Sequence, residues 1–200
     1  MRRIFLYLAT PVLVVTVMGC NKAPEPPQPM AQDTAPPSAA VASTQPATAA
    51  YDLQFLDTMT KHHASAVEMA SMAKGNIQQA GLKKLVTAIP SDQQKEIDQM
   101  KAWREQWYPG APSAENMTMP GMSSSMNMDM SHMQSMKPGP DYDLMFIDMM
   151  TPHHQSAVTM SQDALVKAAH PEIKTLAQQI IDAQTKEIAQ MTTIKASLKK

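Results

Sequence analysis

Two pairs of adjacent histidines in this chain lie in nearly the same sequence context. The first context reads YDLQFLDTMTKHHASAVEMA from Tyr51, and the second reads YDLMFIDMMTPHHQSAVTMS from Tyr142. Neutral imidazole is the commonest metal ligand in proteins, and thioethers favour soft metals such as Cu(I). Histidines accompanied by methionines in both copies therefore predict a metal-binding function.

The candidate ligands occupy equivalent places in the two copies. On a helix, His63 lies about 40° around from Met59, on the stripe expected to face the core, whereas His62 lies on its flank near Met69. One histidine of each pair should point into the fold and its neighbour toward an adjacent helix or solvent. A single histidine here would more simply be a hydrogen-bonded core residue, but duplicated pairs favour ligation. The predicted bundle ligands are His62, His63, His153, His154, Met59, Met69, Met150 and Met160.

The available ligand types narrow the choice of metal. The chain has one cysteine, Cys20, so the folded part offers neither a disulfide nor a thiolate site. Zinc sites usually use cysteine or a third histidine with a carboxylate, and calcium needs many oxygen ligands. Histidine with methionine fits copper, as Cu(I) or Cu(II). Silver is another soft ion and prefers the same ligands.

Two carboxylates interrupt otherwise apolar helical stripes, Glu96 near Gln93 and Glu187 near Gln184. Burying a carboxylate without a partner costs several kcal/mol. These glutamates therefore either lie at the edge of the stripe and meet lysines, or face the histidines. In the second case they would orient the imidazoles by hydrogen bonds or bind the metal directly.

A methionine-rich segment separates the two copies. It is rich in Ser, Gly, Asn and Pro and lacks helical periodicity, so we expect a flexible loop. Its Met117-x-Met119 and Met126-x-Met128-x-Met130 runs are too polar in context to be core. It should capture Cu(I) or Ag(I) weakly, although a low-complexity linker or a partner-binding patch would have the same composition. The weaker candidate ligands are Met117, Met119, Met122, Met126, Met128, Met130, His132, Met133 and Met136. By contrast, Met100, Met145 and Met191 occur at helical spacing and are expected to pack.

An internal duplication must position these residues. Residues 51–100 align with 142–191 without a gap, and 23 of the 50 positions are identical. Each copy reads as two helices with one apolar face, and strand signals are absent. The sequence therefore predicts an all-α fold, an antiparallel four-helix bundle made of helical hairpins 51–109 and 141–200, joined by a flexible loop over 110–140.

Prolines complicate two of the four helices. Pro90 and Pro152 lie inside the helical patterns, where proline should kink or locally break a helix. Because Pro152 directly precedes the second histidine pair, that pair is expected near a helix start, with Thr151 as a possible cap. Lys61 occupies the equivalent place in the first copy, so the two sites need not be identical.

The N-terminal quarter is expected to direct the protein out of the cytoplasm. Residues 1–19 have the basic start and apolar run of a lipoprotein signal peptide, and Cys20 would carry the lipid. Residues 20–50, rich in Pro and Ala, predict a disordered tether. We expect the periplasmic face of the outer membrane, with the inner membrane as the weaker alternative. A net charge of −1 without a basic aromatic stripe gives no support for nucleic-acid binding.

Residues 51–197 resemble the bacterial double-histidine family known as domain of unknown function 305. The resemblance is carried by Met59-Thr60-Lys61-His62-His63 and Met150-Thr151-Pro152-His153-His154, and by an Ile-x-x-x-Gln-x-x-Glu-Ile-x-x-Met signature at Ile89–Met100 and Ile180–Met191. Lys61 departs from the proline usual before the histidine pair. The resemblance implies a ferritin-like four-helix bundle and periplasmic copper binding linked to copper tolerance. It implies no established catalytic activity.

The leading interpretation is an exported, membrane-tethered copper-binding protein, not an enzyme, that sequesters or relays copper through His/Met sites. In that reading the loop collects the ion or hands it over. One alternative is a ferritin-like di-metal oxidase using Glu96, Glu187 and the histidines, but the Glu-x-x-His spacing of such bundles is missing. Another is an interaction module whose methionine loop docks a copper efflux component or a copper oxidase.

Overall fold

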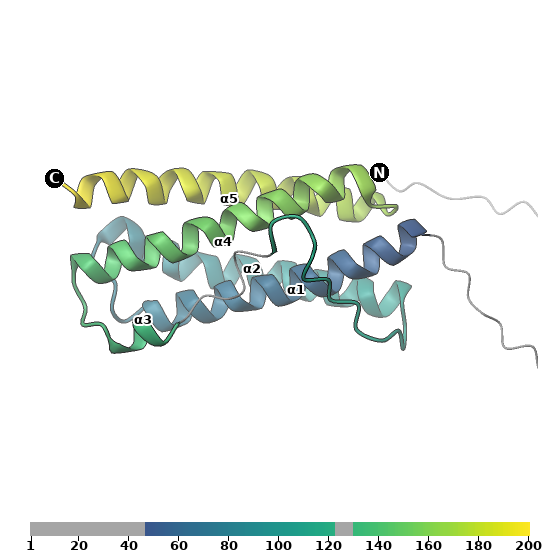
Figure 1. The fold of residues 1–200 in the computed structure, drawn as a ribbon, viewed down its shortest axis with the longest axis horizontal. Coiled ribbons are helices and arrows are strands. Elements are labelled where there is room, and N and C mark those ends of the chain that lie inside the picture. Colours follow the sequence, from purple (N-terminus) through teal and green to yellow (C-terminus); the bar gives the residue numbers. More distant parts are fainter. Residues whose placement is uncertain (1–46, 123–129) are drawn as a thin grey trace, which may run out of the picture. The chain divides into compact units, whose positions relative to one another are not determined.

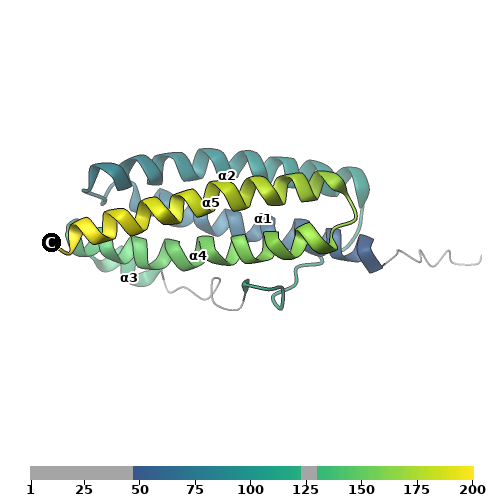
Figure 2. The same cartoon turned by 90° about the horizontal axis from the view of Figure 1, so that it is seen from above.

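Four long helices form the body of the protein. The computed structural model describes residues 47–122 and 130–200. Helices α1 (Ala47–Ala73), α2 (Ala80–Trp107), α4 (Pro140–Lys167) and α5 (Pro171–Leu198) run along a common axis, and the short α3 (Ser131–Ser135) lies against α1 and α4 (Figures 1 and 2). No strand occurs in these residues. The predicted all-α bundle of two helical hairpins is confirmed.

The described residues leave out much of the N-terminal quarter. The predicted signal segment 1–19, Cys20 and most of the predicted tether lie outside them, and α1 begins at Ala47, within the stretch assigned to the tether. Within the described part, no helix is both long enough and apolar enough to cross a bilayer.

The expected core-facing stripes are the buried faces of the helices. On α1 the apolar positions at helical spacing, Phe55, Leu56, Met59, Ala66, Ala70 and Ala73, are buried with His63. On α2 the corresponding stripe runs from Leu82 and is buried up to Met100, while Trp103 and Trp107 at its end are partly buried against the core. The helix ends also follow the sequence signals. Helix α1 stops at Ala73 before Gly75-Asn76, α2 stops at Trp107 before Pro109-Gly110, and Pro171 begins α5.

The predicted helix breaks at proline do not occur. Helices α2 and α4 continue through Pro90 and Pro152. Each proline removes one backbone hydrogen bond, but the buried faces on either side hold the helix together through packing. The second histidine pair therefore lies in the middle of α4 rather than at a helix start. Thr151 caps nothing there; its hydroxyl lies 3.8 Å from the sulfur of Met191.

The apolar core is split into two clusters by the middle of the bundle. Cluster 1, around Phe55 and Leu176, gathers the first half of α1, the end of α2, the second half of α4 and the start of α5. Cluster 2, around Ile89 and Phe146, gathers the opposite halves. The four histidines of the two pairs lie buried in the stretch between the clusters, and these are residues that the sequence marks as candidate ligands.

Two buried aspartates lock the hairpins to each other. Asp52 on α1 accepts the backbone N–H groups of Ala169 and His170 in the α4–α5 connection, at 2.9 Å each. Asp143 on α4 accepts those of Gln78 and Gln79 in the α1–α2 connection, at 2.9 and 2.8 Å. Each hairpin thus supplies a carboxylate that accepts hydrogen bonds from backbone N–H groups in the connection of the other hairpin. Such charge-assisted bonds fix the pairing of the hairpins.

We predict that Asp52→Ala and Asp143→Ala each lower the free energy of unfolding by about 1–3 kcal/mol, because each strands two backbone donors. Urea unfolding followed by circular dichroism measures the change. Asp92→Ala is the matched control, since Asp92 makes only an exposed contact with Lys95, and it should shift stability by at most about 0.5 kcal/mol. Equal effects of the buried and control variants would contradict the proposed lock.

Candidate metal centre

The four histidines form one buried layer at the centre of the bundle. His62 and His63 lie in mid-α1 and His153 and His154 in mid-α4, and no ring is more than 1% exposed. The rings of His62 and His153 meet face to face across the α1–α4 contact, with centroids 3.8 Å apart and planes inclined by 34°. None of the four points into solvent. In each pair the flanking histidine faces an adjacent helix, the first of the two orientations expected. We call these four residues the histidine layer.

Two serines bind the facing pair of histidines from the opposite helix. Nε2 of His62 lies 2.6 Å from the hydroxyl of Ser156, and Nε2 of His153 lies 2.6 Å from that of Ser65. Each hydroxyl also contacts a carbonyl one turn back on its own helix, at 2.7 Å for Ser156 and 2.9 Å for Ser65. A hydroxyl has one hydrogen. Both contacts are satisfied when the serine donates to the carbonyl and the imidazole Nε2–H donates to the serine.

Two glutamates bind the other histidine of each pair within its own hairpin. Nε2 of His63 lies 2.9 Å from a carboxylate oxygen of Glu96, and Nε2 of His154 lies 2.7 Å from one of Glu187. The glutamates thus face the histidines rather than lysines. A carboxylate accepts the Nε2–H, so it fixes the tautomer in which Nδ1 carries the lone pair.

All four Nδ1 atoms are buried and have no hydrogen-bond partner within the described residues. The Ser and Glu contacts assign the proton to Nε2 in each ring, which leaves four bare nitrogen lone pairs in one layer. An unsatisfied buried polar atom costs about 1–3 kcal/mol. The donor set therefore fits a group that accepts nitrogen lone pairs, such as a metal ion.

Burial keeps the facing pair of imidazoles neutral. Removal from water lowers the pKa of His62 well below its usual value, and the neighbouring histidines, His153 first, lower it further. Burial, followed by repulsion from His154 and His63, lowers the pKa of His153 to about 3. Neutral imidazole is the form that ligates metals, so these two residues are ready for ligation without losing a proton.

Thioethers lie on both sides of the layer. Cluster 1 contains Met59, Met100 and Met160, and cluster 2 contains their repeat equivalents Met150, Met191 and Met69. All six side chains are buried. The four predicted methionine ligands are thus divided equally between the two faces of the layer, one from α1 and one from α4 on each face.

No three His, Cys, Asp or Glu side chains converge on a common metal position in residues 47–122 and 130–200. The glutamates are engaged with Nε2, on the opposite side of each ring from the bare Nδ1. The candidate donors left for a metal ion in the layer are imidazole nitrogen and methionine sulfur. This mixed set is the one that Cu(I) and other soft ions prefer.

Sequence reasoning missed two serines and undervalued two glutamines. Ser65 and Ser156 occupy the same place in both copies, two residues after the pair, and that repetition was the available signal. Gln93 and Gln184 were noted in the apolar stripes without a role. Both are at most 4% exposed, and neither amide atom has a partner among the described residues. They lie one turn before the glutamates, so they add polar capacity beside the layer.

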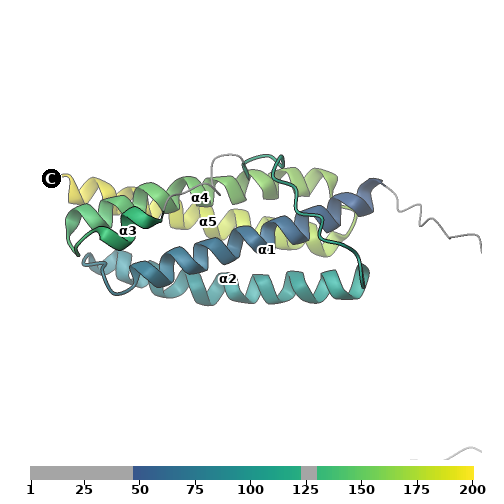
Figure 3. The same cartoon turned by 60° about the horizontal axis from the view of Figure 1, so that its bottom comes forward.

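The segment after α2 is a strap over the α1–α4 face. Residues 111–122 cross α1 and reach α4 (Figures 1 and 3). Asp57 accepts the backbone N–H of Ala114 at 2.9 Å, and Thr58 accepts that of Asn116 at 2.9 Å. Lys61, which replaces the proline of the second copy, pairs with Glu115 at 2.5 Å. Here the departure from the repeat serves to attach the strap.

The expectation that Met117, Met119, Met126, Met128 and Met130 are too polar in context to be core is wrong for Met119. Met119 and Met122 at the end of the strap are buried in cluster 1, and Met133 on α3 is buried in cluster 2. Met130 and Met136 are partly buried beside it. The linker is short of other apolar residues, so its methionines cover the core. Met117 and His132 are exposed, while Met126 and Met128 lie outside the described residues.

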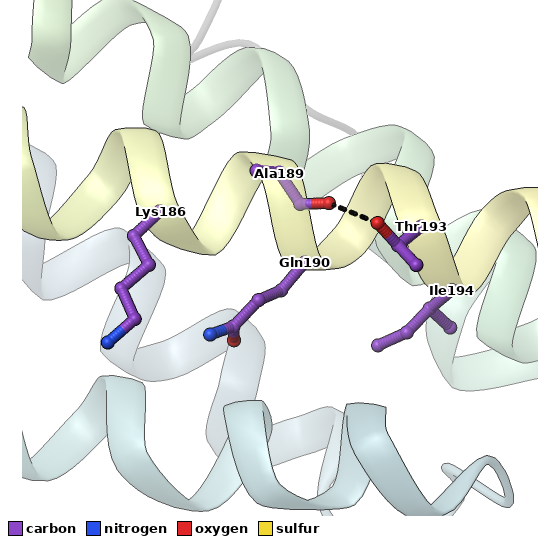
Figure 4. Close-up of a pocket in the computed structure, with 5 residues that line it drawn as sticks. All are labelled: Lys186, Ala189, Gln190, Thr193 and Ile194. Carbon is purple, nitrogen blue, oxygen red and sulfur yellow. Dashed lines mark hydrogen bonds between the residues drawn. The ribbon is translucent and has the colours of Figure 1, made fainter.

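One cavity, on α5, contains none of the candidate metal ligands. It has a volume of about 390 Å³ and is lined by Lys186, Ala189, Gln190, Thr193 and Ile194 of α5, whose longer side chains point toward α2 (Figure 4). It contains neither histidine nor methionine. The candidate metal ligands of the bundle therefore lie in its packed centre and not in this cavity.

Comparison with known proteins identifies the family of this chain. The profile described as "Domain of unknown function (DUF305)" matches residues 52–195. The chain belongs to the DUF305 family. The resemblance inferred from the double-histidine motifs is thus confirmed. Among curated proteins, none matches the chain.

Solved structures of other proteins, CopM among them, are similar to this DUF305 chain. CopM in its Cu(II)-bound form is 36% identical, with a TM-score of 0.63, and covers 73% of this chain and 96% of its own. CopM in its Cu(I)-bound form and in a silver-bound form is 34% identical, with a TM-score of 0.62 and the same coverage. A DUF305 protein of Streptomyces coelicolor, described as secreted, is 25% identical, with a TM-score of 0.65, and covers 74% of this chain and 92% of its own.

Acid should destabilise the metal-free DUF305 protein through His62 and His153. Their folded-state pKa values lie below the unfolded value of about 6.5, so the unfolded chain binds protons that the folded chain does not. The free energy of unfolding should fall as pH drops below about 6.5, by up to about 1.4 kcal/mol per pH unit for each histidine. Urea unfolding at a series of pH values measures the slope.

The matched control for this pH experiment is the exposed His132. His132→Gln should leave the slope unchanged, whereas the double variant His62→Gln/His153→Gln should flatten it. A stability that does not change between pH about 7 and about 5 would show that the facing imidazoles titrate normally.

Gly121 should be needed to seat the strap. Its φ is +91°, and a Cβ there would lie 2.6 Å from the backbone oxygen of Ser156. Gly121→Ala should therefore lift the strap and make Met122 reactive toward hydrogen peroxide, read by mass spectrometry. Gly110→Ala is the control, because Gly110 also has a positive φ but open space around it. Equal protection of Met122 in both variants would contradict this role of Gly121.

Proposed function

We propose that this DUF305 protein binds copper in the histidine layer and acts as an exported, membrane-tethered carrier that sequesters or relays copper ions. The observation that carries the proposal is the set of four buried, unpartnered Nδ1 atoms between two groups of buried thioethers. Each Nε2 is held by Ser or Glu, so the rings are oriented in advance for ligation through Nδ1.

The similar structures support copper as the metal. CopM has been solved with Cu(I), with Cu(II) and with silver. Imidazole serves both oxidation states of copper, whereas thioethers favour Cu(I) and, by the same softness, Ag(I). The donor set of this chain holds both ligand types in one place, so we propose that it accepts the same ions.

We propose a binding role rather than catalysis. An oxidase of the di-metal bundle type gathers four carboxylates around its metals. Here Glu96 and Glu187 are each committed to one histidine, and Asp52 and Asp143 are bound to backbone N–H groups of the inter-helix connections. The arrangement of these residues favours holding an ion over activating a substrate.

We also propose where the protein lies in the cell and which proteins receive its copper. The signal-like residues 1–19, with Cys20 as the lipidated residue, would place the bundle outside the cytoplasm on a tether. The outer membrane facing the periplasm is the proposed site, and copper homeostasis or tolerance is the proposed role. A copper efflux or oxidase component would be a natural recipient of a relayed ion.

A Cu(I) competition titration against a chromophoric chelator tests the proposal. The variant with His62, His63, His153 and His154 all changed to Gln should lose the tight class of sites. The double variant Glu96→Gln/Glu187→Gln should weaken it by about 10–100-fold, because the imidazoles lose their orienting carboxylates.

The control for the titration is His132→Gln, which changes an exposed histidine outside the layer. Its affinity should equal that of the unaltered protein, and circular dichroism should show the helical fold in every variant. Unchanged affinity in the folded quadruple variant would refute the histidine layer as the copper site.

A further inference from the structure

A second group of thioethers lines a cavity at the other end of α1 from the strap's anchor. The cavity has a volume of about 300 Å³ and is lined by Met72, Asn76, Met133, Gln134 and Tyr142. It lies where the end of α1, the short α3 and the start of α4 come together (Figure 3). It is separate from the histidine layer, which lies in the middle of the bundle.

The lining has the chemistry of a soft monovalent cation site. Met72 comes from α1 and is partly exposed, while Met133 comes from α3 and is buried, so two thioethers meet from different segments. The amide of Gln134 contacts the sulfur of Met72 at 3.8 Å and holds that side chain at the cavity. The remaining lining is amide and phenol, and no charged side chain takes part. A hard divalent ion would require carboxylates, whereas Cu(I) or Ag(I) accepts neutral sulfur.

Met133 at the cavity belongs to the same buried cluster as methionines that flank the histidine layer. Met133 belongs to cluster 2 together with Met69 and Met150, and the partly buried Met130 and Met136 pack against the same cluster. Along α1, Met72, Met69 and His62 succeed one another over ten residues, which is about 15 Å of helix. Thioether sulfur is thus present at the cavity, in Met72 and Met133, and nearer to the histidine layer, in Met69.

We propose that this cavity is an uptake site, in which the sulfurs of Met72 and Met133 bind Cu(I) or Ag(I) before the ion passes by Met69 to the histidine layer. The passage step rests on the proposed copper function of that layer. Binding in the cavity itself does not, because its ligands are a different set of residues.

Nuclear magnetic resonance of the full chain with ¹³C-labelled methionine methyl groups tests the uptake site, with Ag(I) as the added ion. The methyl signals of Met72 and Met133 should shift on addition of Ag(I), both in the unaltered protein and in the quadruple histidine-to-glutamine variant. In the quadruple variant the signal of Met100, which is buried in cluster 1 and outside the cavity lining, should not shift at the same Ag(I) concentration. Methyl signals of Met72 and Met133 that do not move in the unaltered protein would overturn the proposal.

Conservative variants separate the uptake site from the histidine layer. Met72→Leu should abolish the Ag(I) shift of the Met133 methyl and slow Cu(I) loading from the chelator several-fold, while the final Cu(I) affinity stays unchanged. Met145→Leu is the control, because Met145 packs against cluster 2 outside the cavity lining, and it should load at the normal rate. A Met72→Leu protein that keeps the Met133 shift would overturn the cavity as a two-sulfur site. Normal affinity in the quadruple histidine variant, with the cavity shifts intact, would instead reject the proposed function and leave the cavity standing.

Discussion

The burial of four imidazoles in one cross-section of the bundle is the constraint on which the rest of the structure depends. An apolar core would pack more simply without them, and a polar layer is tolerated only where each group finds a partner. Here one nitrogen of each ring is satisfied, by Ser65, Ser156, Glu96 or Glu187, and the other is not. The folded state thus keeps four buried Nδ1 atoms without a hydrogen-bond partner among the described residues, which lowers its stability. Buried donor atoms of this kind are expected where a ligand binds.

The duplication explains how the layer is built from few parts. The contact between His62 and Ser156 is matched, 91 residues on, by the contact of His153 with Ser65, and the aspartate locks are exchanged between the hairpins in the same way. Contacts between His and Glu stay within one hairpin, whereas contacts between His and Ser join the two. Neither hairpin alone completes the layer. Its geometry is therefore coupled to the docking of α1 against α4.

The linker breaks this symmetry. It contributes the strap on one side, with Met119 and Met122 in cluster 1, and α3 on the other, with Met133 in cluster 2. Both ends of the linker therefore bring thioethers against the core, and the α3 end also borders a cavity lined by two methionines. Lys61 takes part in this asymmetry by pairing with Glu115 of the strap, where the second copy has a proline inside α4. Two nearly equivalent halves can thereby differ in how an ion reaches them.

The sequence by itself determined the helices, their stripes, the four histidines and the flanking Met59, Met69, Met150 and Met160, because periodicity and internal repetition are local properties of the chain. It also indicated that Glu96 and Glu187 faced either the histidines or lysines. Tertiary structure decided between those alternatives. It also decided that α2 and α4 continue through Pro90 and Pro152, since packing on both sides outweighs one lost hydrogen bond. The roles of Ser65 and Ser156 and the burial of Met119, Met122 and Met133 depend on contacts between segments far apart in the chain, and no local pattern encodes such contacts.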